Sequence, residues 1–402
     1  MMHITLLKNK RIVLVITESR HNEVFHALCF ASLLIQAGTK LHVVLSPGAQ
    51  QFLSAFANQP TLGNKSYRAD NSSDRRGVLQ KVPSQNIDLM IIAPCNNYIA
   101  QELSNSLTKG SLTLPSAPDQ KYYPVLIVRA LDKRCKSASI KTINRLTEHG
   151  VYIVQPPAMD CVRPSELLGY VRMILGKKGR LAEKKIVVTA GGTQEAIDPV
   201  RMITNRSSGK QGYALAQAAI DQGAHVTLIT TPTSLPTPIG AKVLRVYNAQ
   251  QMFEAVLAES NSADALLMAA AVADFRAKGI ASNKIKKQEG VPQIELEVTP
   301  DILAAITRSR LQKKHPRIVV GFAAESHDLI RNATLKLRSK QADIIVANDI
   351  TTPDAGFGVD TNRVILLFAD GRKELLPLIT KVEVAEIICR HVTDLLRTRN
   401  LG

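Results

Sequence analysis

Short apolar runs alternate along this chain with longer segments in which apolar residues recur every three or four positions. The runs are rich in Val, Ile and Leu, so we expect strands buried on both faces of a parallel sheet. These expected strands are Ile12–Ile16, Leu41–Leu45, Leu89–Ala93, Val125–Val128, Val151–Val154, Ile186–Thr189, His225–Ile229, Ala265–Ala269, Ile318–Gly321, Ile344–Ala347 and Val364–Phe368. The expected helices include Gln211–Gln222, Gln250–Ala258, Asp301–Ser309, Leu329–Lys340 and Val382–Leu396.

The two halves of the chain repeat one plan. Each begins with a basic pair, at residues 10–11 and 184–185, followed by a strand, a helical segment, a Gly turn and another strand. Gly38 and Gly223 stand just past the helical pattern, where a helix C-cap favours glycine. Strands that alternate with helices predict right-handed βαβ units. We therefore predict an α/β fold with two doubly wound, mostly parallel-sheet, Rossmann-like domains in tandem.

A polar stretch with two glycines separates these halves. It spans residues 176–183 and includes Lys177, Lys178 and Arg180. Such a composition is typical of a linker, so the predicted domains are residues 1–175 and 184–402.

Composition narrows the possible functions. The formal net charge of +17 favours an anionic partner, either a nucleic acid or a small phosphorylated molecule. Aromatic residues make up only 4% and Trp is absent, so an RNA-stacking surface is not indicated. No apolar run approaches the ~20 residues of a membrane span, and Lys8 and Lys10 interrupt the start. We therefore expect a cytoplasmic protein with neither a membrane nor a nucleic acid as partner. The 5 Cys residues form no CxxC pair and predict neither zinc nor disulfides.

A Gly-Gly turn follows the first expected strand of the second half. Gly191 and Gly192 let the backbone approach a phosphate at a strand's carboxyl end, and the Thr193 hydroxyl adds a donor. The motif is neither GxGxxG nor a Walker loop, which argues against a dinucleotide-dependent oxidoreductase. A simple tight turn is the alternative interpretation.

Polar and basic residues crowd the start of the next expected helix. Arg201, Asn205, Ser207, Ser208 and Gly209 precede Gln211, where free N–H groups and the helix dipole favour anions. The alternative is an ordinary loop with Ser207 or Ser208 as N-cap.

A third cluster stands where the strand Ala265–Ala269 ends. The small residues of 268–273 permit close approach of a flat base, and Asp274 can accept hydrogen bonds or help to hold a metal. Ten residues later, Lys284, Lys286 and Lys287 supply point charges suited to a polyphosphate, although such a group is usually a solvated face.

These clusters occur in one order with four further motifs over residues 183–398. The motifs are Thr299-Pro300-Asp301-Ile302, Gly321-Phe322-Ala323-Ala324-Glu325, Val346-Ala347-Asn348-Asp349 and Ala355-Gly356-Phe357-Gly358. The set closely resembles the phosphopantothenate–cysteine ligase family. The resemblance implies an enzyme of coenzyme A synthesis with 4′-phosphopantothenate, CTP and cysteine as substrates and Mg²⁺ accompanying CTP. It also implies pairing through the ligase domain into a homodimer or higher homo-oligomer.

The resemblance assigns roles residue by residue. Asn205 matches the residue that steadies the acyl-cytidylate, and Lys284 matches the lysine of a mobile flap. The matched nucleotide contacts are Met268, Ala269, Ala270, Asp274, Lys284, Thr299, Pro300, Asp301, Ile302, Phe322, Lys336 and Lys340. The phosphate and substrate contacts expected from the residues are Gly191, Gly192, Thr193, Arg201, Ser207, Ser208 and Gly209. At position 299 this chain has Thr, where bacterial relatives usually have Asn. The resemblance does not indicate which side chains would bind a metal.

The first half resembles the flavin-dependent phosphopantothenoylcysteine decarboxylase to which this ligase is often fused, but its chemistry is eroded. The Gly-rich flavin-phosphate turn is replaced by a segment with Glu18, the active-site His falls near Gln80, and Pro-Ala-Met-Asn is replaced by residues 129–132. Cys161 matches the remaining catalytic position, with a leftover thiol as the favoured reading over a retained acid–base Cys. We hypothesise that this half has lost FMN and decarboxylation and serves as a scaffold. A fully bifunctional enzyme and a basic nucleic-acid-binding scaffold are the alternatives.

Overall fold

A computed structural model describes residues 5–17, 19–54, 66–67, 87–108, 123–130, 138–156, 161–349, 351, 356 and 358–399. The chain divides into two compact units, Met1–Leu175 and Gly176–Gly402. The sequence predictions at Glu18, at Gln80 and at residues 131–132 lie outside the described residues. Within those residues no helix is long and apolar enough to span a bilayer.

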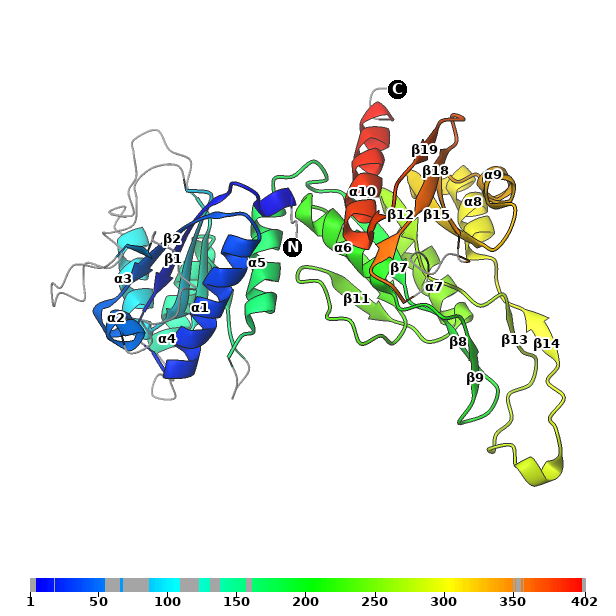
Figure 1. Ribbon diagram of the computed structural model, residues 1–402, viewed down its shortest axis with the longest axis horizontal. Helices are drawn as coiled ribbons and strands as arrows, with labels where there is room; N and C mark the ends of the chain where they lie inside the picture. The colour runs from blue at the N-terminus through cyan, green and yellow to red at the C-terminus, as the bar shows by residue number, and fades with distance from the viewer. Residues whose placement is uncertain are drawn as a thin grey trace. The chain divides into compact units, whose positions relative to one another are not determined.

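The first unit is built on a six-stranded sheet of order β3-β2-β1-β4-β5-β6 (Figure 1). Every strand pair in it is parallel. Its strands are β1 (Arg11–Ile16), β2 (Lys40–Leu45), β3 (Ser66–Tyr67), β4 (Leu89–Cys95), β5 (Val125–Arg129) and β6 (Tyr152–Val154). Its helices are α1 (His21–Gln36), α2 (Pro47–Ser54), α3 (Asn97–Thr108), α4 (Ala138–Glu148) and α5 (Pro164–Gly176), and a 3-10 turn, η1, spans Thr5–Leu7.

Alternate strand residues of this sheet face two separate cores. Ile12 and Leu14 pack in one cluster with residues of α1 and α5, whereas Val13 and Val15 pack in the other with residues of α3 and α4. Helices therefore cover both faces, which is why these strands read as continuous apolar runs.

The second unit contains an eight-stranded sheet of order β11-β10-β7-β12-β15-β16-β18-β19. Its strands are β7 (Lys185–Ala190), β10 (His225–Thr230), β11 (Lys242–Arg245), β12 (Ala265–Met268), β15 (Ile318–Glu325), β16 (Ile344–Asp349), β18 (Val364–Phe368) and β19 (Lys373–Leu375). Its helices are α6 (Lys210–Asp221), α7 (Ala249–Ser260), α8 (Ile302–Lys313), α9 (Leu329–Ser339) and α10 (Lys381–Thr398). The last two strands are antiparallel, and the other ladders are parallel.

Three small antiparallel ribbons stand apart from the large sheet. They are β8 (Gln194–Ala196) with β9 (Met202–Thr204), β13 (Phe275–Ala277) with β14 (Leu296–Val298), and β17 (Thr361–Asn362) with β20 (Ile379–Thr380). The segment between β13 and β14 carries the 3-10 turn η4 (Lys287–Glu289). This segment and the β8–β9 ribbon both project from the large sheet (Figure 1). We call residues 275–298, which run from β13 to β14, the arm.

The predicted fold class is confirmed. In each unit the first strand lies between the second and the fourth, so the strand order reverses at β1/β4 and at β7/β12. Gly38 and Gly223 have φ of 82° and 89°, as the predicted C-caps require. The sequence could not predict that strand β18 (Val364–Phe368) runs antiparallel to its neighbour, because parallel and antiparallel buried strands have the same apolar pattern.

The segment predicted as a linker packs against the end of α6. Leu181 N–H donates to the Gln222 carbonyl oxygen at 2.8 Å, and a Cβ added to Gly179 would lie 2.4 Å from the same oxygen. Residues 176–183 all fall within the second unit. Glycine at position 179 is therefore explained by close backbone packing.

Helix α6 begins directly over the end of β7 because Gly212 lets the two elements touch. A Cβ on Gly212 would lie 2.5 Å from the Ala190 Cβ and 2.7 Å from the Thr189 carbonyl oxygen. Both are closer than real Cβ contacts, so only glycine permits this packing. The contact places the N-terminus of α6 beside the Gly191 turn.

We predict that Gly212→Ala lowers the free energy of unfolding by about 1–3 kcal/mol, because it overpacks the α6–β7 contact. Urea unfolding followed by circular dichroism measures the change. Gly279→Ala is the matched control, since a Cβ there meets nothing within 4 Å. Equal stability of the two variants would contradict the packing argument.

Candidate functional site

The candidate site lies where the sheet order of the second unit reverses. The chain leaves β7 toward one side and β12 toward the other, so the carboxyl ends of these neighbouring strands border a crevice, the usual ligand position in open parallel sheets. A parallel bridge between Gly192 and Ala271 continues the contact beyond both strands. The Gly-Gly turn and the small-residue cluster singled out in the sequence therefore meet.

The turn after β7 requires both of its glycines. Gly191 has φ of 85°, and a Cβ there would lie 2.0 Å from the Thr231 Oγ1. A Cβ on Gly192 would lie 2.8 Å from the Asn205 carbonyl oxygen. The glycines bring this turn against two neighbouring loops and leave its backbone uncovered by a side chain of its own.

The N-terminus of α6 has no side-chain cap within the described structure. Its N-cap is Gly209, at φ 77°, and its first turn contains no acidic residue. The alternative interpretation, with Ser207 or Ser208 as N-cap, is wrong, although Ser208 Oγ lies 3.5 Å from the Lys210 nitrogen. Because the Lys210 N–H donates to Ser208 Oγ, the N–H groups of Gln211 and Gly212 are the ones available to an anion beside Gly191.

Lys210, at the start of α6, is held by a Gly-containing loop. Its Nζ donates to the Gly358 carbonyl oxygen at 2.9 Å and pairs with Asp360 at 2.7 Å. From α10, the buried Lys381 Nζ donates to the carbonyl oxygens of Gly356 and Val359, at 2.8 and 2.6 Å. Burial lowers the Lys381 pKa, with Lys210 adding to the shift and Asp360 opposing it.

Asn205 and Thr193 fix the loop after β12. Asn205 Nδ2 donates to the carbonyl oxygens of Ala271 and Val272, at 3.3 and 3.1 Å. The fully buried Thr193 hydroxyl accepts the Ala273 N–H at 2.9 Å. Because the Asn205 amide nitrogen faces two carbonyls, its Oδ1 is the end left for a ligand.

Thr299 holds the backbone on either side of Asp274. Its hydroxyl donates to the Ala273 carbonyl oxygen at 2.6 Å, and its N–H donates to the Asp274 carbonyl oxygen at 3.0 Å. The Asp274 side chain remains exposed. The departure from Asn at position 299 thus has a structural role in this chain.

Lys336 stands at the centre of the charged part of the site. Its Nζ donates to the Phe322 carbonyl oxygen at 2.7 Å. Burial lowers the Lys336 pKa, the carboxylates of Glu325 and Asp274 oppose that shift, and the ammonium of Lys340 adds to it. These interactions bring Asp274, from the loop after β12, and Glu325, the last residue of β15, together with both predicted lysines.

Lys340 is paired with the N-cap of α8. It contacts the carboxylate of Asp301, whose other oxygen accepts the Ala304 N–H at 2.9 Å. Burial opposes ionisation of Asp301, but these bonds outweigh it and lower its pKa. Pro300 and Ile302 are the neighbours of Asp301 in the sequence. Met268, on β12, is buried, and its sulfur accepts a hydrogen bond from the Thr189 hydroxyl.

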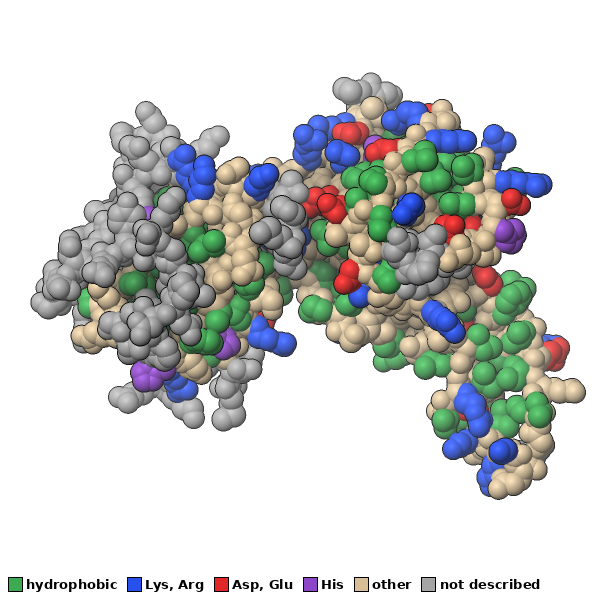
Figure 2. Space-filling view, in the orientation of Figure 1, with side chains coloured by type: hydrophobic (Ala, Val, Ile, Leu, Met, Phe, Trp, Pro, Cys, Tyr) green, Lys and Arg blue, Asp and Glu red, His purple; other side chains and the backbone are tan. Residues whose placement is uncertain are grey.

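Lys284 is exposed and belongs to the arm, which projects from the large sheet (Figure 1). Figure 2 shows hydrophobic side chains along the arm and basic side chains toward its tip. Arg201, predicted as a phosphate contact, pairs with Asp198 at 2.6 Å and donates to the Ile285 carbonyl oxygen at 3.1 Å. The sequence reasoning missed Asp198 and Glu325 as site-forming residues, because only tertiary contacts show what they touch.

No group of three His, Cys, Asp or Glu side chains suited to a metal occurs among the described residues. Mg²⁺ bound with a nucleotide needs only one or two protein carboxylates, because phosphates and water complete its coordination. Asp274 is an exposed carboxylate beside Lys336 and can supply such a ligand, whereas the exposed Asp301 is paired with Lys340.

At the corresponding edge of the first unit, described side chains bond to the backbone and to one another. Thr17, after β1, donates to the Pro94 carbonyl oxygen at 2.7 Å. In the first turn of α1, the buried Glu23 accepts the Ser19 hydroxyl at 2.5 Å. A carboxylate at this helix N-terminus occupies the electrostatic position that a flavin phosphate would need.

Cys161 is buried against a cavity of about 20 Å³, which Glu23, His26 and Arg129 also line. That volume accommodates roughly one water molecule. Among the described residues at this end of the sheet, the buried Glu23 carboxylate and this small cavity are poorly suited to a flavin phosphate.

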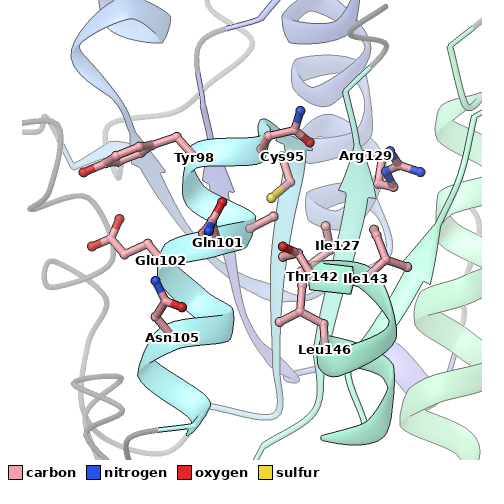
Figure 3. A pocket seen from close by; sticks show the side chains of 12 residues that line it. Cys95, Tyr98, Gln101, Glu102, Asn105, Ile127, Arg129, Thr142, Ile143 and Leu146 are labelled. Carbon is pink, nitrogen blue, oxygen red and sulfur yellow. The ribbon is translucent and has the colours of Figure 1, made fainter. Parts of the chain in front are cut away.

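A larger cavity, of about 420 Å³, lies between α3 and α4 (Figure 3). The Cys95 thiol points into it, with Tyr98 and Gln101 on α3 and Arg129 at the end of β5. Burial raises the pKa of Cys95 to about 12, although Arg129 opposes the shift. The thiol is therefore protonated at neutral pH and is not a ready nucleophile.

Residues 181–396 match the family model for the DNA/pantothenate metabolism flavoprotein C-terminal domain. The chain is 35% identical to the coenzyme A biosynthesis bifunctional protein CoaBC of Bacillus subtilis (strain 168), over 97% of this chain and 98% of that protein. It is 34% identical to CoaBC of Mycobacterium tuberculosis (strain CDC 1551 / Oshkosh), over 90% of this chain and 92% of that protein.

The chain belongs to the CoaBC family. This confirms the family predicted from the ordered motifs and places the chain among the enzymes of coenzyme A biosynthesis. The crystal structure of a CoaBC C-terminal domain is 40% identical, covers 55% of this chain and 99% of that chain, and has a TM-score of 0.47. The alignments with whole CoaBC proteins include the first unit as well as the second.

We predict that Thr193→Val destabilises the protein by about 1–3 kcal/mol, because the buried Ala273 N–H loses its acceptor while the side-chain volume is kept. Thr193→Ser keeps the acceptor and is the control. Urea unfolding measures both variants. A Val variant as stable as the Ser variant would show that the hydroxyl does not support the loop.

Proposed function

We propose that the second unit is a phosphopantothenate–cysteine ligase that uses CTP. The observation that carries this proposal is that Asp274, Lys336 and Lys340 gather beside β15, two strands along the sheet from β7, whose end carries the Gly191 turn and the N-terminus of α6. Two positively polarised places, one at a helix end and one at a lysine pair, suit a reaction between two phosphorylated substrates. Family membership supports the same assignment.

In the first step the carboxylate of 4′-phosphopantothenate attacks the α-phosphate of CTP and expels pyrophosphate. Negative charge grows on the leaving group, so Lys336, Lys340 and the arm's Lys284 stabilise the transition state once they face the triphosphate. Lys340 must exchange its contact with Asp301 for a phosphate. Mg²⁺, held in part by Asp274, would supply further charge neutralisation.

In the second step the cysteine amine attacks the activated carbonyl, and CMP leaves. Asn205 stands between the Gly192 turn and the loop after β12, where its Oδ1 can accept a hydrogen bond from the intermediate or the incoming amine. The small residues Ala269 and Ala270 leave room for the flat base. Positioning and electrostatic stabilisation are thus the tasks of these residues.

We further propose that the first unit neither holds FMN nor decarboxylates. The support is the buried Glu23 at the N-terminus of α1 and the ~20 Å³ cavity at Cys161. The test is the absorbance of the purified chain near 450 nm, an order-of-magnitude position for a flavin band. A flavin present at about one per chain would overturn this part of the proposal.

The second candidate function is a fully bifunctional enzyme. It is favoured by the 420 Å³ cavity, which lies in the size range of small-molecule sites, and by alignments that span both units. An assay of the full chain with CTP, 4′-phosphopantothenate and cysteine, following CMP and carbon dioxide together, separates the two. Release of CMP without carbon dioxide is the result we expect.

We propose that a second copy of the chain covers the arm. Phe275 and Val298 are cross-strand partners on the β13–β14 ribbon and are 52% and 75% exposed. An isolated two-stranded ribbon is marginally stable in water, and an exposed apolar face favours association. Pairing through the arm would bring Lys284 near the partner's site.

We predict that Asn205→Ala accumulates the acyl-cytidylate, because activation proceeds while the step with cysteine is slowed. Lys284→Gln should instead slow cytidylate formation. Pyrophosphate release without and with cysteine measures both effects. Wild-type rates in either variant would remove that residue from the mechanism.

We predict that Val298→Lys shifts the protein toward monomer, because it places a charge on the apolar face of the arm. Light scattering after size-exclusion chromatography measures the mass. Leu375→Lys is the control, since Leu375 is also exposed, at 72%, but lies on β19. A Val298→Lys protein of unchanged mass would contradict pairing through the arm.

A further inference from the structure

The turn between β8 and β9 grips the arm at the residue that follows Lys284. The side chain of Asp198 is buried, and its Oδ1 accepts the N–H groups of Val200 and Arg201, each at 2.7 Å. Its Oδ2 receives Arg201 Nη1 at 2.6 Å and the Ile285 N–H at 3.3 Å. One carboxylate therefore closes its own turn and reaches the arm.

Arg201 completes this clamp on the other side of Ile285. The same Nη1 donates to the Ile285 carbonyl oxygen at 3.1 Å, so both the N–H and the carbonyl group of Ile285 are held. A further bond joins the Ala281 N–H to the Ile197 carbonyl oxygen at 3.0 Å. By contrast, a Cβ at Gly279 or Gly290 would meet nothing within 4 Å, so the ends of this segment are loosely packed.

The clamp is charged at physiological pH. Burial opposes ionisation of Asp198, but the N–H groups of Val200, Arg201 and Ile285 and the Arg201 side chain outweigh it and lower the Asp198 pKa to about 2. A carboxylate that accepts several N–H bonds holds them more strongly than a neutral acceptor would.

We propose that Asp198 is a positioning residue that acts through Arg201 and Ile285 to set where the arm's Lys284 stands. The inference deepens the proposed ligase function and rests on it. Lys284 is exposed and follows a segment with few contacts, so its ammonium has no fixed place unless its neighbour is held. The clamp restricts the lysine's backbone while its side chain stays free to reach a triphosphate.

The informative variant is Asp198→Asn, which keeps the shape and changes one atom. The remaining Oδ1 still accepts from Val200 and Arg201 and preserves the turn. The new Nδ2 faces the Arg201 guanidinium and the Ile285 N–H, so donors meet donors and the clamp opens. Asp370→Asn is the matched control, because Asp370 accepts the N–H and Nε of Arg372 in a turn far along the chain.

The first measurement does not depend on catalysis. We expect trypsin to cleave Asp198→Asn after Lys284, Lys286 and Lys287 about 10-fold faster than the full-length wild type, because a local opening that was rare becomes common. Mass spectrometry of the early fragments identifies these cuts. Asp370→Asn should be cleaved there at the wild-type rate.

The second measurement is pyrophosphate release from CTP. We expect Asp198→Asn to lower its kcat about 10- to 100-fold with a smaller change in the KM for CTP, the cost of a misplaced charged group. In the Lys284→Gln background the same substitution should have no further effect, because its action passes through that lysine.

Unchanged cleavage in Asp198→Asn overturns the clamp, and so does an additive loss of rate in the double variant. If Asp198→Asn fails to fold, Arg201→Gln replaces it, since removal of the guanidinium frees the Ile285 carbonyl oxygen and leaves the Asp198 turn in place. Faster cleavage of that variant supports the clamp, and wild-type cleavage overturns it. A wild-type chain that releases no pyrophosphate defeats the ligase proposal instead, whatever the cleavage shows.

Discussion

The close contact between α6 and the end of β7 is the constraint on which the rest of the second unit depends. Gly212 allows the helix to touch Thr189 and Ala190, and Gly209 and Gly191 then bring the helix start against the strand's exit. This geometry places uncapped N–H groups in a crevice between two parallel strands. Without it, the parallel strands would still form a sheet, but no anion site would stand at the point where the strand order reverses.

Polar side chains that bond to the backbone fix the shape of this crevice. The hydroxyls of Thr193 and Thr299 and the amide of Asn205 bond to the backbone of the loop after β12, so its small residues form a defined surface. The two lysines are also held in place, because Lys336 donates to the Phe322 carbonyl oxygen and Lys340 pairs with Asp301. Preformed contacts of this kind lower the cost of organising charge around a reacting phosphate.

The two units share one strand order and differ at the strand ends. In the second unit the first strand leads into glycines and an uncapped helix. In the first unit it leads to Thr17, bonded to Pro94, and to a buried Glu23 in the first helical turn. The sheet supports either outcome because its stability comes from apolar faces, whereas ligand chemistry depends on a few residues beyond the strands.

The sequence by itself determined the α/β class, most strands and helices, and the family, because buried parallel strands and ordered motifs are local signals. Through the family resemblance, the sequence also predicted that Asp274, Lys336 and Lys340 contact the same nucleotide. It did not reveal that Thr193 points inward, that Gly209 replaces a serine as the N-cap, or that Arg201 is engaged by Asp198 and Ile285. The bonds from Thr193 to Ala273 and from Asp198 and Arg201 to Ile285 join groups that are 80 to 87 residues apart, and only the tertiary packing brings such groups together.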